Sequence, residues 1–351
     1  MAGNPFTLSF GIAPKQYIAR TSQTEKIVES FLDTEPSDYT YIISGVRGSG
    51  KTVMLSTIAE EFDKKKDWIV INVTPDIDIV NAIVGHLYSQ RGLRNLFVEA
   101  KIDLSALGIG VSIKNATPVY DMTVALESLL KEIDKKKYRV LIAIDEIVNN
   151  KNVKVFAGIF QLLIRQKLPI FLVATGLYES INSLQNEKTL TFLYRAPKVY
   201  LEALSIVNIA LSYKAIFNVS DEKARRMANL TKGYAYAYQV LGYLYAEKYL
   251  GTKEEGDLDA IMNEYDGMLS EYVYEKIWSE LPNMEKQIVT LLVKNDQMKI
   301  QDIREELNIS TSQMSVYRDR LKRKGLVETP AFGQLSLCLP RFKEIAYFWI
   351  E

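Results

Sequence analysis

One eight-residue segment constrains the fold of this chain more than any other feature. Residues 45–52 read Gly-Val-Arg-Gly-Ser-Gly-Lys-Thr and match the pattern G-x-x-x-x-G-K-[ST] in full. The segment directly follows an apolar stretch, Thr40 to Ser44, and precedes a helical stretch, Val53 to Phe62. This strand, loop and helix are the context that the pattern requires. The glycines let successive backbone N–H groups converge on phosphate oxygens at a helix N-terminus, so we expect a phosphate-binding loop.

The side chains at the end of this loop predict a nucleotide with Mg²⁺. Lys51 supplies a positive charge to the β- and γ-phosphates, and the Thr52 hydroxyl can ligate the metal. A glycine-rich turn that ends in Lys-Thr by chance is the alternative, and it arises in roughly one chain in a hundred of this length. The predicted nucleotide-binding residues are Gly45, Val46, Arg47, Gly48, Ser49, Gly50, Lys51, Thr52 and Val53.

Up to about residue 205 the chain alternates between short apolar stretches and helical periodicities. The further predicted strands are Trp68–Val73, Arg139–Ile144, Ile170–Ala174 and Lys198–Leu201. They are apolar almost throughout, as strands covered on both faces must be. Five such strands with helices between them predict an α/β fold with a parallel three-layer sheet. Residues 105–114 alternate apolar and small side chains, which indicates an inserted hairpin.

Polar residues that follow two of these strands predict the chemistry. Asp145 and Glu146 come directly after an apolar strand, where Asp145 can hold Mg²⁺ and Glu146 can polarise a water for attack on the γ-phosphorus. Thr175 follows the next strand and can bond the γ-phosphate or the attacking water, although threonine is also frequent at strand ends. Arg195 precedes the last strand and can stabilise transition-state charge, with a surface salt bridge as the alternative.

After about residue 205 the strands stop and helices follow. Breaks are expected at 218–220 and 231–233, where Ser220 is a plausible N-cap. We therefore divide the chain into a P-loop ATPase core at 1–205, a helical lid at 206–270 and a C-terminal domain at 271–351.

The C-terminal domain reads as a winged helix-turn-helix. Its third predicted helix runs from Thr311 to Gly325, and two short strands at 326–329 and 335–339 form the wing. From Thr311 to Lys324 five basic residues stand against Asp319, a net charge of +4, whereas 281–351 as a whole carries only +2. Duplex DNA is thus a plausible partner, and protein docking is the alternative. The residues proposed to contact DNA are Ser312, Gln313, Ser315, Arg318 and Lys322.

Composition removes several other function classes. Lys plus Arg and Asp plus Glu each number 43, so the formal net charge is zero and does not indicate a polyanion binder over the whole chain, which leaves a local basic patch open. The single cysteine, Cys338, and the single histidine, His86, argue against an internal disulfide, a zinc site and a histidine-dependent protease or hydrolase. We see no secretory signal and no apolar run near the ~20 residues that span a bilayer, so we expect a cytoplasmic protein without a membrane partner.

Together the GVRGSGKT loop, the apolar strand ending in Asp145-Glu146, the strand ending in Thr175 and the helical lid resemble AAA-type ATPases. The chain is most similar to their archaeal-type and origin-recognition-like group, which borders the STAND NTPases, over residues 16–351. The resemblance implies ATP rather than GTP and a C-terminal winged helix. Two departures stand out. The entry motif reads Tyr17-Ile18-Ala19-Arg20, and Lys232-Gly233-Tyr234-Ala235 replaces the usual Gly-Gly-x-Pro, so no sensor arginine can be placed, although Arg225 and Arg226 lie near.

These observations favour a Mg²⁺-dependent ATPase whose nucleotide state is coupled to a C-terminal winged helix that binds DNA. The alternative is a slow or inactive nucleotide-binding scaffold whose winged helix docks a protein partner. A small-molecule kinase is a weaker hypothesis, because the second half of the chain offers no substrate lid. A homo-oligomer is possible, since Arg195 can act on a neighbouring copy.

Overall fold

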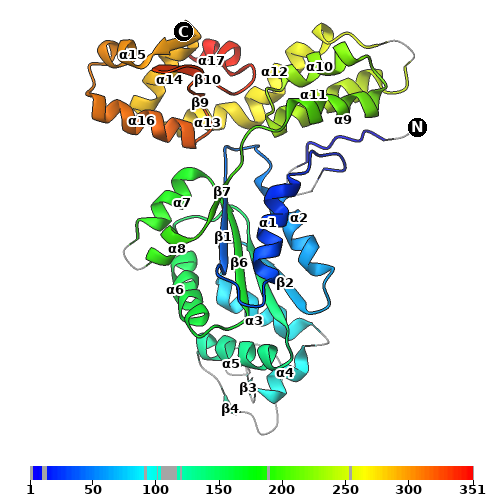
Figure 1. Ribbon diagram of the computed structural model, residues 1–351, viewed down its shortest axis with the longest axis vertical. Helices are drawn as coiled ribbons and strands as arrows, with labels where there is room; N and C mark the ends of the chain where they lie inside the picture. Colours follow the sequence, from blue (N-terminus) through cyan, green and yellow to red (C-terminus); the bar gives the residue numbers. More distant parts are fainter. Residues whose placement is uncertain are drawn as a thin grey trace. The chain divides into compact units, whose positions relative to one another are not determined.

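The structure is a computed structural model. It describes residues 3–9, 14–90, 93–100, 102–103, 117–118, 121–187, 190–252 and 255–350. The contacts between Cα atoms divide the chain into two compact units, whose helices and strands are labelled in Figure 1. Unit 1 comprises Met1–Ala19, Gly45–Gly50 and Leu201–Glu351, and unit 2 comprises Arg20–Ser44 and Lys51–Tyr200. The division into three domains with boundaries at 205 and 270 stays a prediction.

A five-stranded parallel sheet forms the centre of unit 2. Its order is β2-β5-β6-β1-β7, and all neighbouring strands run parallel. The strands are β1 (Thr40–Ser44), β2 (Trp68–Val73), β5 (Arg139–Ile144), β6 (Ile170–Gly176) and β7 (Lys198–Tyr200). Every residue of β1 and β6 is buried, as their apolar sequences require. The predicted α/β fold and its five strands are confirmed, with β6 continuing through Thr175 to Gly176.

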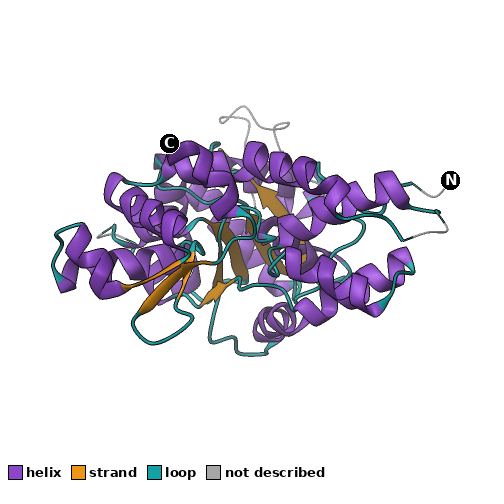
Figure 2. Cartoon of the chain, turned by 90° about the horizontal axis from the view of Figure 1, so that it is seen from above, coloured by secondary structure: helices purple, strands orange, loops and turns teal. Residues whose placement is uncertain are grey.

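Helices cover both faces of this sheet. They are α1 (Thr21–Leu32), α2 (Lys51–Asp63), α3 (Ile79–Ser89), α4 (Arg94–Glu99), α5 (Met122–Lys135), α6 (Lys151–Arg165), α7 (Tyr178–Gln185) and α8 (Thr191–Arg195). On one face Phe31 of α1 contacts the rings of Phe62 in α2 and Phe171 in β6. On the other face α3, α5 and α6 share a second core with alternate residues of the strands. Figures 1 and 2 show the sheet between these two sets of helices.

A short parallel pair, β3 (Ile102–Asp103) and β4 (Thr117–Pro118), precedes α5. The predicted hairpin at 105–114 falls outside the described residues.

The first part of unit 1 after residue 200 is helical. It contains α9 (Ile206–Phe217), α10 (Asp221–Leu230), α11 (Ala235–Tyr249), α12 (Met262–Leu269) and α13 (Glu275–Glu280), with a π-helical turn at Ser270–Tyr274. The predicted breaks are confirmed. Asn218 takes a left-handed conformation at the end of α9, and the Ser220 hydroxyl accepts a hydrogen bond from the Lys223 N–H at 3.3 Å.

The N-terminal segment packs into this helical core through Phe6. The ring is almost fully buried, and its centroid lies 5.4 Å from that of Tyr238 and 5.7 Å from that of Phe217. Gly242 of α11 makes room for it, because a Cβ at that position would lie 2.4 Å from the ring.

The C-terminal part of unit 1 joins four helices to a small antiparallel sheet of order β8-β10-β9. Its elements are α14 (Asn283–Asn295), β8 (Gln297–Lys299), α15 (Ile300–Glu306), α16 (Thr311–Arg323), β9 (Val327–Glu328), β10 (Gln334–Leu337) and α17 (Phe342–Ile350). The sequence pattern predicted three helices and two strands here, and it gave no sign of β8 and α17. We call residues 281–350 the C-terminal module.

Within the described ranges, no helix combines the length and the apolar character needed to cross a membrane.

Candidate nucleotide-binding site

The phosphate-binding motif forms a loop between β1 and α2. The loop runs from Gly45 to Gly50, and α2 begins at Lys51. Gly48 and Gly50 have φ angles of +75° and +93°, a left-handed conformation that favours glycine. A Cβ on Gly45 would lie 2.5 Å from the Ser49 Oγ. The glycines thus meet local backbone and space requirements of a loop that presents N–H groups to an anion.

Side chains at the start of α2 differ in burial. Lys51 is only 6% exposed, and Thr52 and Val53 are half-buried. A lysine that is this shielded from water is stabilised by negative charge close to its side chain, and a bound phosphate would supply such charge.

The Thr52 hydroxyl meets the carboxylate that the sequence predicted as its partner in metal binding. Thr52 Oγ1 donates to Asp145 Oδ2 at 2.8 Å, although the two residues are 93 positions apart. Asp145 comes directly after β5, while Thr52 lies near the start of the helix that follows β1. β5 and β1 both pair with β6, so the carboxyl ends of three strands meet here.

Thr175 completes a hydrogen-bonded cluster around this carboxylate. Its hydroxyl donates to Asp145 Oδ1 and accepts from the Glu146 N–H at 3.0 Å. The Glu146 N–H also lies 3.1 Å from Asp145 Oδ1. Thr175 is fully buried, so water does not compete for these bonds. The bonds therefore hold the Asp145 carboxylate and the backbone of Glu146 in a fixed orientation.

This donor set fits Mg²⁺ bound together with a nucleotide. Mg²⁺ is usually held by one or two carboxylates with substrate phosphates and waters. Asp145 and the Thr52 hydroxyl supply that kind of partial shell. In the described part of the chain no cluster of three or more His, Cys, Asp or Glu side chains offers an all-protein metal site.

Glu146 takes an uncommon backbone conformation next to the cluster. Its φ is +52°, which costs a non-glycine residue on the order of 1 kcal/mol. Its side chain is exposed, and no partner of its carboxylate is found among the described residues. The carboxylate is therefore available to a water molecule.

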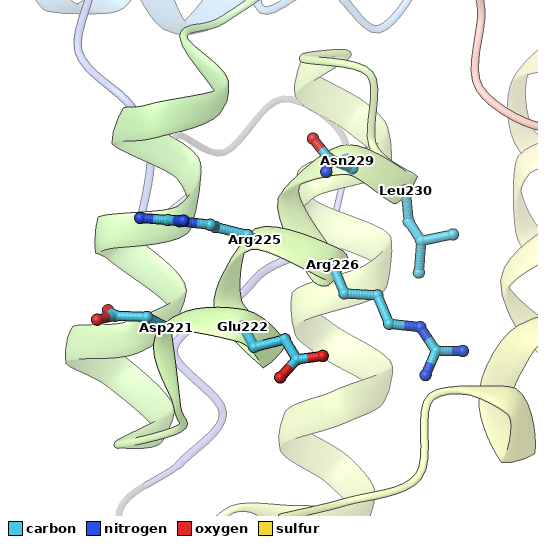
Figure 3. A pocket seen from close by; sticks show the side chains of 6 residues that line it. All are labelled: Asp221, Glu222, Arg225, Arg226, Asn229 and Leu230. Carbon is cyan, nitrogen blue, oxygen red and sulfur yellow. The ribbon is translucent and has the colours of Figure 1, made fainter.

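The arginines considered in the sequence analysis lie in different places. Arg195 is the last residue of α8 and is exposed, with no ion pair among the residues that the structure describes. Arg225 and Arg226 belong to α10, where they help to line a shallow surface hollow (Figure 3). Their side chains extend in opposite directions in this view, and Arg226 pairs with Asp259 at 2.7 Å.

Two residues that the sequence analysis did not propose for the site contact the loop. The Tyr234 hydroxyl donates to the Arg47 carbonyl at 2.5 Å, and the Tyr236 N–H donates to the Gly48 carbonyl at 3.0 Å. Both tyrosines belong to unit 1, as do loop residues 45–50. The signal was the departure from the family pattern at Lys232 to Ala235, where Tyr234 stands.

The predicted DNA-contacting residues lie on α16, with varying exposure. Ser312, Gln313 and Lys322 are exposed, whereas Ser315 and Arg318 are half-buried. Gln313 takes part in a capping box with Ser310.

The basic charge of this helix is partly neutralised within the C-terminal module. Arg318 pairs with Asp319 at 2.8 Å. Lys324 lies 2.5 Å and Arg320 4.0 Å from Glu285, which is only 1% exposed. Burial lowers the pKa of Lys324 to about 8 and raises the pKa of Glu285 above its ordinary value. Three of the five basic side chains behind the local charge of +4 therefore face acids.

Comparisons with known proteins agree with the fold. A family described as a domain of unknown function (DUF8462) matches residues 271–345. No curated protein matches the sequence. The Aeropyrum pernix ORC2 protein in ADPNP-ADP complexes superposes with a TM-score of 0.61 at 15% identity, covering 97% of this chain and 96% of that chain. Its ADP form gives a TM-score of 0.51 at 14% identity, covering 97% and 95%.

The Cdc6p protein from Pyrobaculum aerophilum gives a TM-score of 0.49 at 17% identity, covering 97% of this chain and 96% of that chain. The strand–loop–helix motif, the parallel sheet and the full-length likeness to ORC2 point to the same architecture. This chain therefore shares the fold of the Aeropyrum pernix ORC2 protein, with a parallel α/β sheet, a loop of the G-x-x-x-x-G-K-[ST] pattern and helices after it.

Proposed function

We propose that this chain binds ATP with Mg²⁺, hydrolyses it, and uses the nucleotide state to control its C-terminal module. The observation that carries the proposal is the 2.8 Å hydrogen bond from Thr52 to Asp145. It joins two sequence motifs that were identified independently, and both are needed for phosphoryl chemistry with a metal. The nucleotide complexes named for the Aeropyrum pernix ORC2 protein support a nucleotide ligand for this chain.

Each residue of the site then has a role in binding. N–H groups of the loop at residues 45–50 bind the phosphates, and Lys51 balances charge on the β- and γ-phosphates. Thr52 and Asp145 hold Mg²⁺, which neutralises charge on the phosphate oxygens when bound. Thr175 keeps Asp145 in place through its hydroxyl and is close to the strand end where a γ-phosphate contact is expected.

Two exposed side chains act in hydrolysis. Glu146 orients a water for in-line attack on the γ-phosphorus, and this role is supported by its exposure and by the lack of a partner for its carboxylate among the described residues. Arg195 stabilises the transition-state charge, either within the same copy or in a second copy of the chain. Its exposure and the lack of an ion pair in the described part of unit 2 favour this over a structural salt bridge.

For the C-terminal module we propose a winged helix-turn-helix that binds duplex DNA through α16. The antiparallel sheet β8-β10-β9 beside α14, α15 and α16 supports the winged helix. Ser312, Gln313, Ser315, Arg318 and Lys322 are the proposed contacts. The alternative, a slow or inactive scaffold whose module docks a protein, is favoured by one observation. Arg318, Arg320 and Lys324 have acidic neighbours, which reduces the charge offered to phosphates.

The test is steady-state ATP hydrolysis with and without duplex DNA at ~50 mM salt, where phosphate contacts are least screened. We compare the wild type with Glu146→Gln and with Glu60→Gln, an exposed glutamate on α2 as matched control. Hydrolysis that is lost only in Glu146→Gln supports the ATPase. Stimulation by DNA supports the DNA-binding module, and indifference to DNA supports a protein partner. A wild-type rate no higher than that of Glu146→Gln refutes hydrolysis and leaves the scaffold.

A further inference from the structure

We propose that Tyr234 is a positioning residue that holds the phosphate loop in its binding conformation from the start of α11. The inference deepens the proposed function, because it concerns the same loop. No role in nucleotide binding was assigned to this tyrosine by the motif, which contains only residues 45–52.

The loop contains a hydrogen-bonded turn, and residues at the start of α11 bond two of its carbonyl groups. Within the loop the Ser49 N–H donates to the Val46 carbonyl at 3.1 Å, which closes a four-residue turn. Gly48 is the third residue of this turn, and its φ of +75° is the conformation that such turns assign to glycine. The turn leaves the carbonyls of Arg47 and Gly48 without a partner inside it, and these are the two groups that α11 contacts.

The two contacts have different donors. Tyr234 precedes α11, is 6% exposed, and donates its hydroxyl to the Arg47 carbonyl at 2.5 Å. Tyr236 lies in the first turn of α11, where N–H groups lack partners within the helix. Its N–H finds the Gly48 carbonyl at 3.0 Å. The Tyr236 bond is a backbone bond that any residue can make, so Tyr234 supplies the contact that depends on the side chain.

Peptide geometry explains why holding a carbonyl positions an N–H group. The Arg47 carbonyl and the Gly48 N–H belong to the same peptide unit, and in a planar trans peptide they point in opposite directions. A carbonyl fixed toward Tyr234 therefore turns the Gly48 N–H away from α11. The same argument applies to the Gly48 carbonyl and the Ser49 N–H. The orientation of N–H groups is what a phosphate loop offers to its ligand.

The packing around Tyr234 makes this contact specific to the present side chains. A Cβ on Gly48 would lie 2.3 Å from the Tyr234 hydroxyl oxygen, so the ring occupies the space that glycine leaves. On its other side the ring stacks on Tyr274, with centroids 6.2 Å apart. Burial raises the pKa of Tyr234 well above its usual range, so the hydroxyl keeps its proton and remains a donor at physiological pH.

The test compares Tyr234→Phe with Tyr213→Phe as the matched control. Tyr213 is also a fully buried tyrosine of unit 1, and its hydroxyl also donates to a backbone carbonyl, that of Tyr238 at 2.7 Å. Both variants lose one buried hydroxyl, but only Tyr234→Phe loses a bond to the loop. A second control, Glu280→Gln, removes the exposed ion pair between Glu280 and Arg47 at 3.5 Å, which we expect to matter little.

The first readout needs no nucleotide. Amide hydrogen exchange at Ser49 measures opening of the turn, and losing one hydrogen bond predicts exchange roughly 2- to 10-fold faster in Tyr234→Phe. The second readout is the dissociation constant for ATP with Mg²⁺, which we expect to rise by a similar factor. Both controls should match the wild type in both readouts.

Wild-type exchange at Ser49 in Tyr234→Phe overturns the inference, and so does an equal effect of Tyr213→Phe. Faster exchange with an unchanged ATP affinity also overturns it, because the loop would then bind phosphate without being held. A wild type that binds no ATP refutes the proposed function, whereas the exchange comparison still decides whether Tyr234 holds the loop.

Discussion

The hydroxyl of Thr175 should contribute measurably to the free energy of unfolding of unit 2, because it bonds both Asp145 and the backbone of Glu146. Thr175→Val keeps the shape of the side chain and removes the hydroxyl that bonds Asp145 and the Glu146 N–H. Thr40→Val is the matched control in the same sheet. Thr40 is 5% exposed, and its hydroxyl has no hydrogen-bond partner in the part of the chain that the structure describes.

The two substitutions should change the free energy of unfolding in different directions. A hydrogen bond to an ionised group contributes about 1.5–3 kcal/mol, and the Glu146 N–H keeps Asp145 as a second acceptor at 3.1 Å. We therefore expect Thr175→Val to lower the free energy of unfolding by about 2 kcal/mol. Thr40→Val removes a buried hydroxyl that lacks a partner, so stability should stay the same or rise by up to about 1 kcal/mol.

Tryptophan fluorescence can isolate unit 2 in a urea titration. The chain has three tryptophans, of which Trp68 lies in unit 2 and Trp278 and Trp349 lie in unit 1. A background with Trp278→Phe and Trp349→Phe reports unfolding around Trp68 alone. Equal losses in the two threonine variants, or no loss in Thr175→Val, would refute the proposed cluster of hydrogen bonds.

Two further predictions concern unit 1. Phe6→Ala should lower the free energy of unfolding of unit 1 by about 3–5 kcal/mol, because a buried ring is lost. Urea unfolding followed by fluorescence measures this loss, with Phe332→Ala as a control at a fully exposed ring. If the two variants were equally stable, the prediction would be wrong. Lys324 has a folded pKa of about 8, below its ordinary value of 10.5, so between these pH values the unfolded chain binds more protons and stability should rise with pH. Urea titrations at pH 7.5 and 9.5 should show this rise in the wild type and not in Lys324→Met, in which Glu285 and Arg320 are unchanged. Parallel pH profiles of the wild type and the variant would argue against the prediction.

The parallel sheet was predictable because its strands are buried on both faces. Such strands must be apolar throughout, so they stand out from the sequence without knowledge of their neighbours. The strand order β2-β5-β6-β1-β7 was not predictable in this way. β8 was missed because Gln297 and Lys299 are exposed and polar, and pairing with β10 rather than local preference holds the strand.

In the candidate site, too, local sequence patterns predicted some features, and long-range contacts could not be predicted from them. The loop between β1 and α2 and the position of Asp145-Glu146 after β5 were predictable because they follow from residue types at fixed local spacing, while their chemistry stays a proposal. The contact of Tyr234 with the Arg47 carbonyl joins residues 187 positions apart and involves a backbone group, which leaves no trace in residue type. The pairing of Lys324 with Glu285 reduces the positive charge that α16 presents, and the sequence alone does not show which of its charged side chains face inward.

By itself the sequence determined that this chain contains a parallel α/β sheet with a phosphate loop and acidic residues at a strand end. These features follow from short patterns of apolar and glycine residues whose backbone requirements are local. Only the tertiary structure decided which hydroxyls bond Asp145, which helix holds the loop, and which basic side chains of α16 are neutralised. Those contacts join residues far apart in the chain, and their partners are selected by how the elements pack.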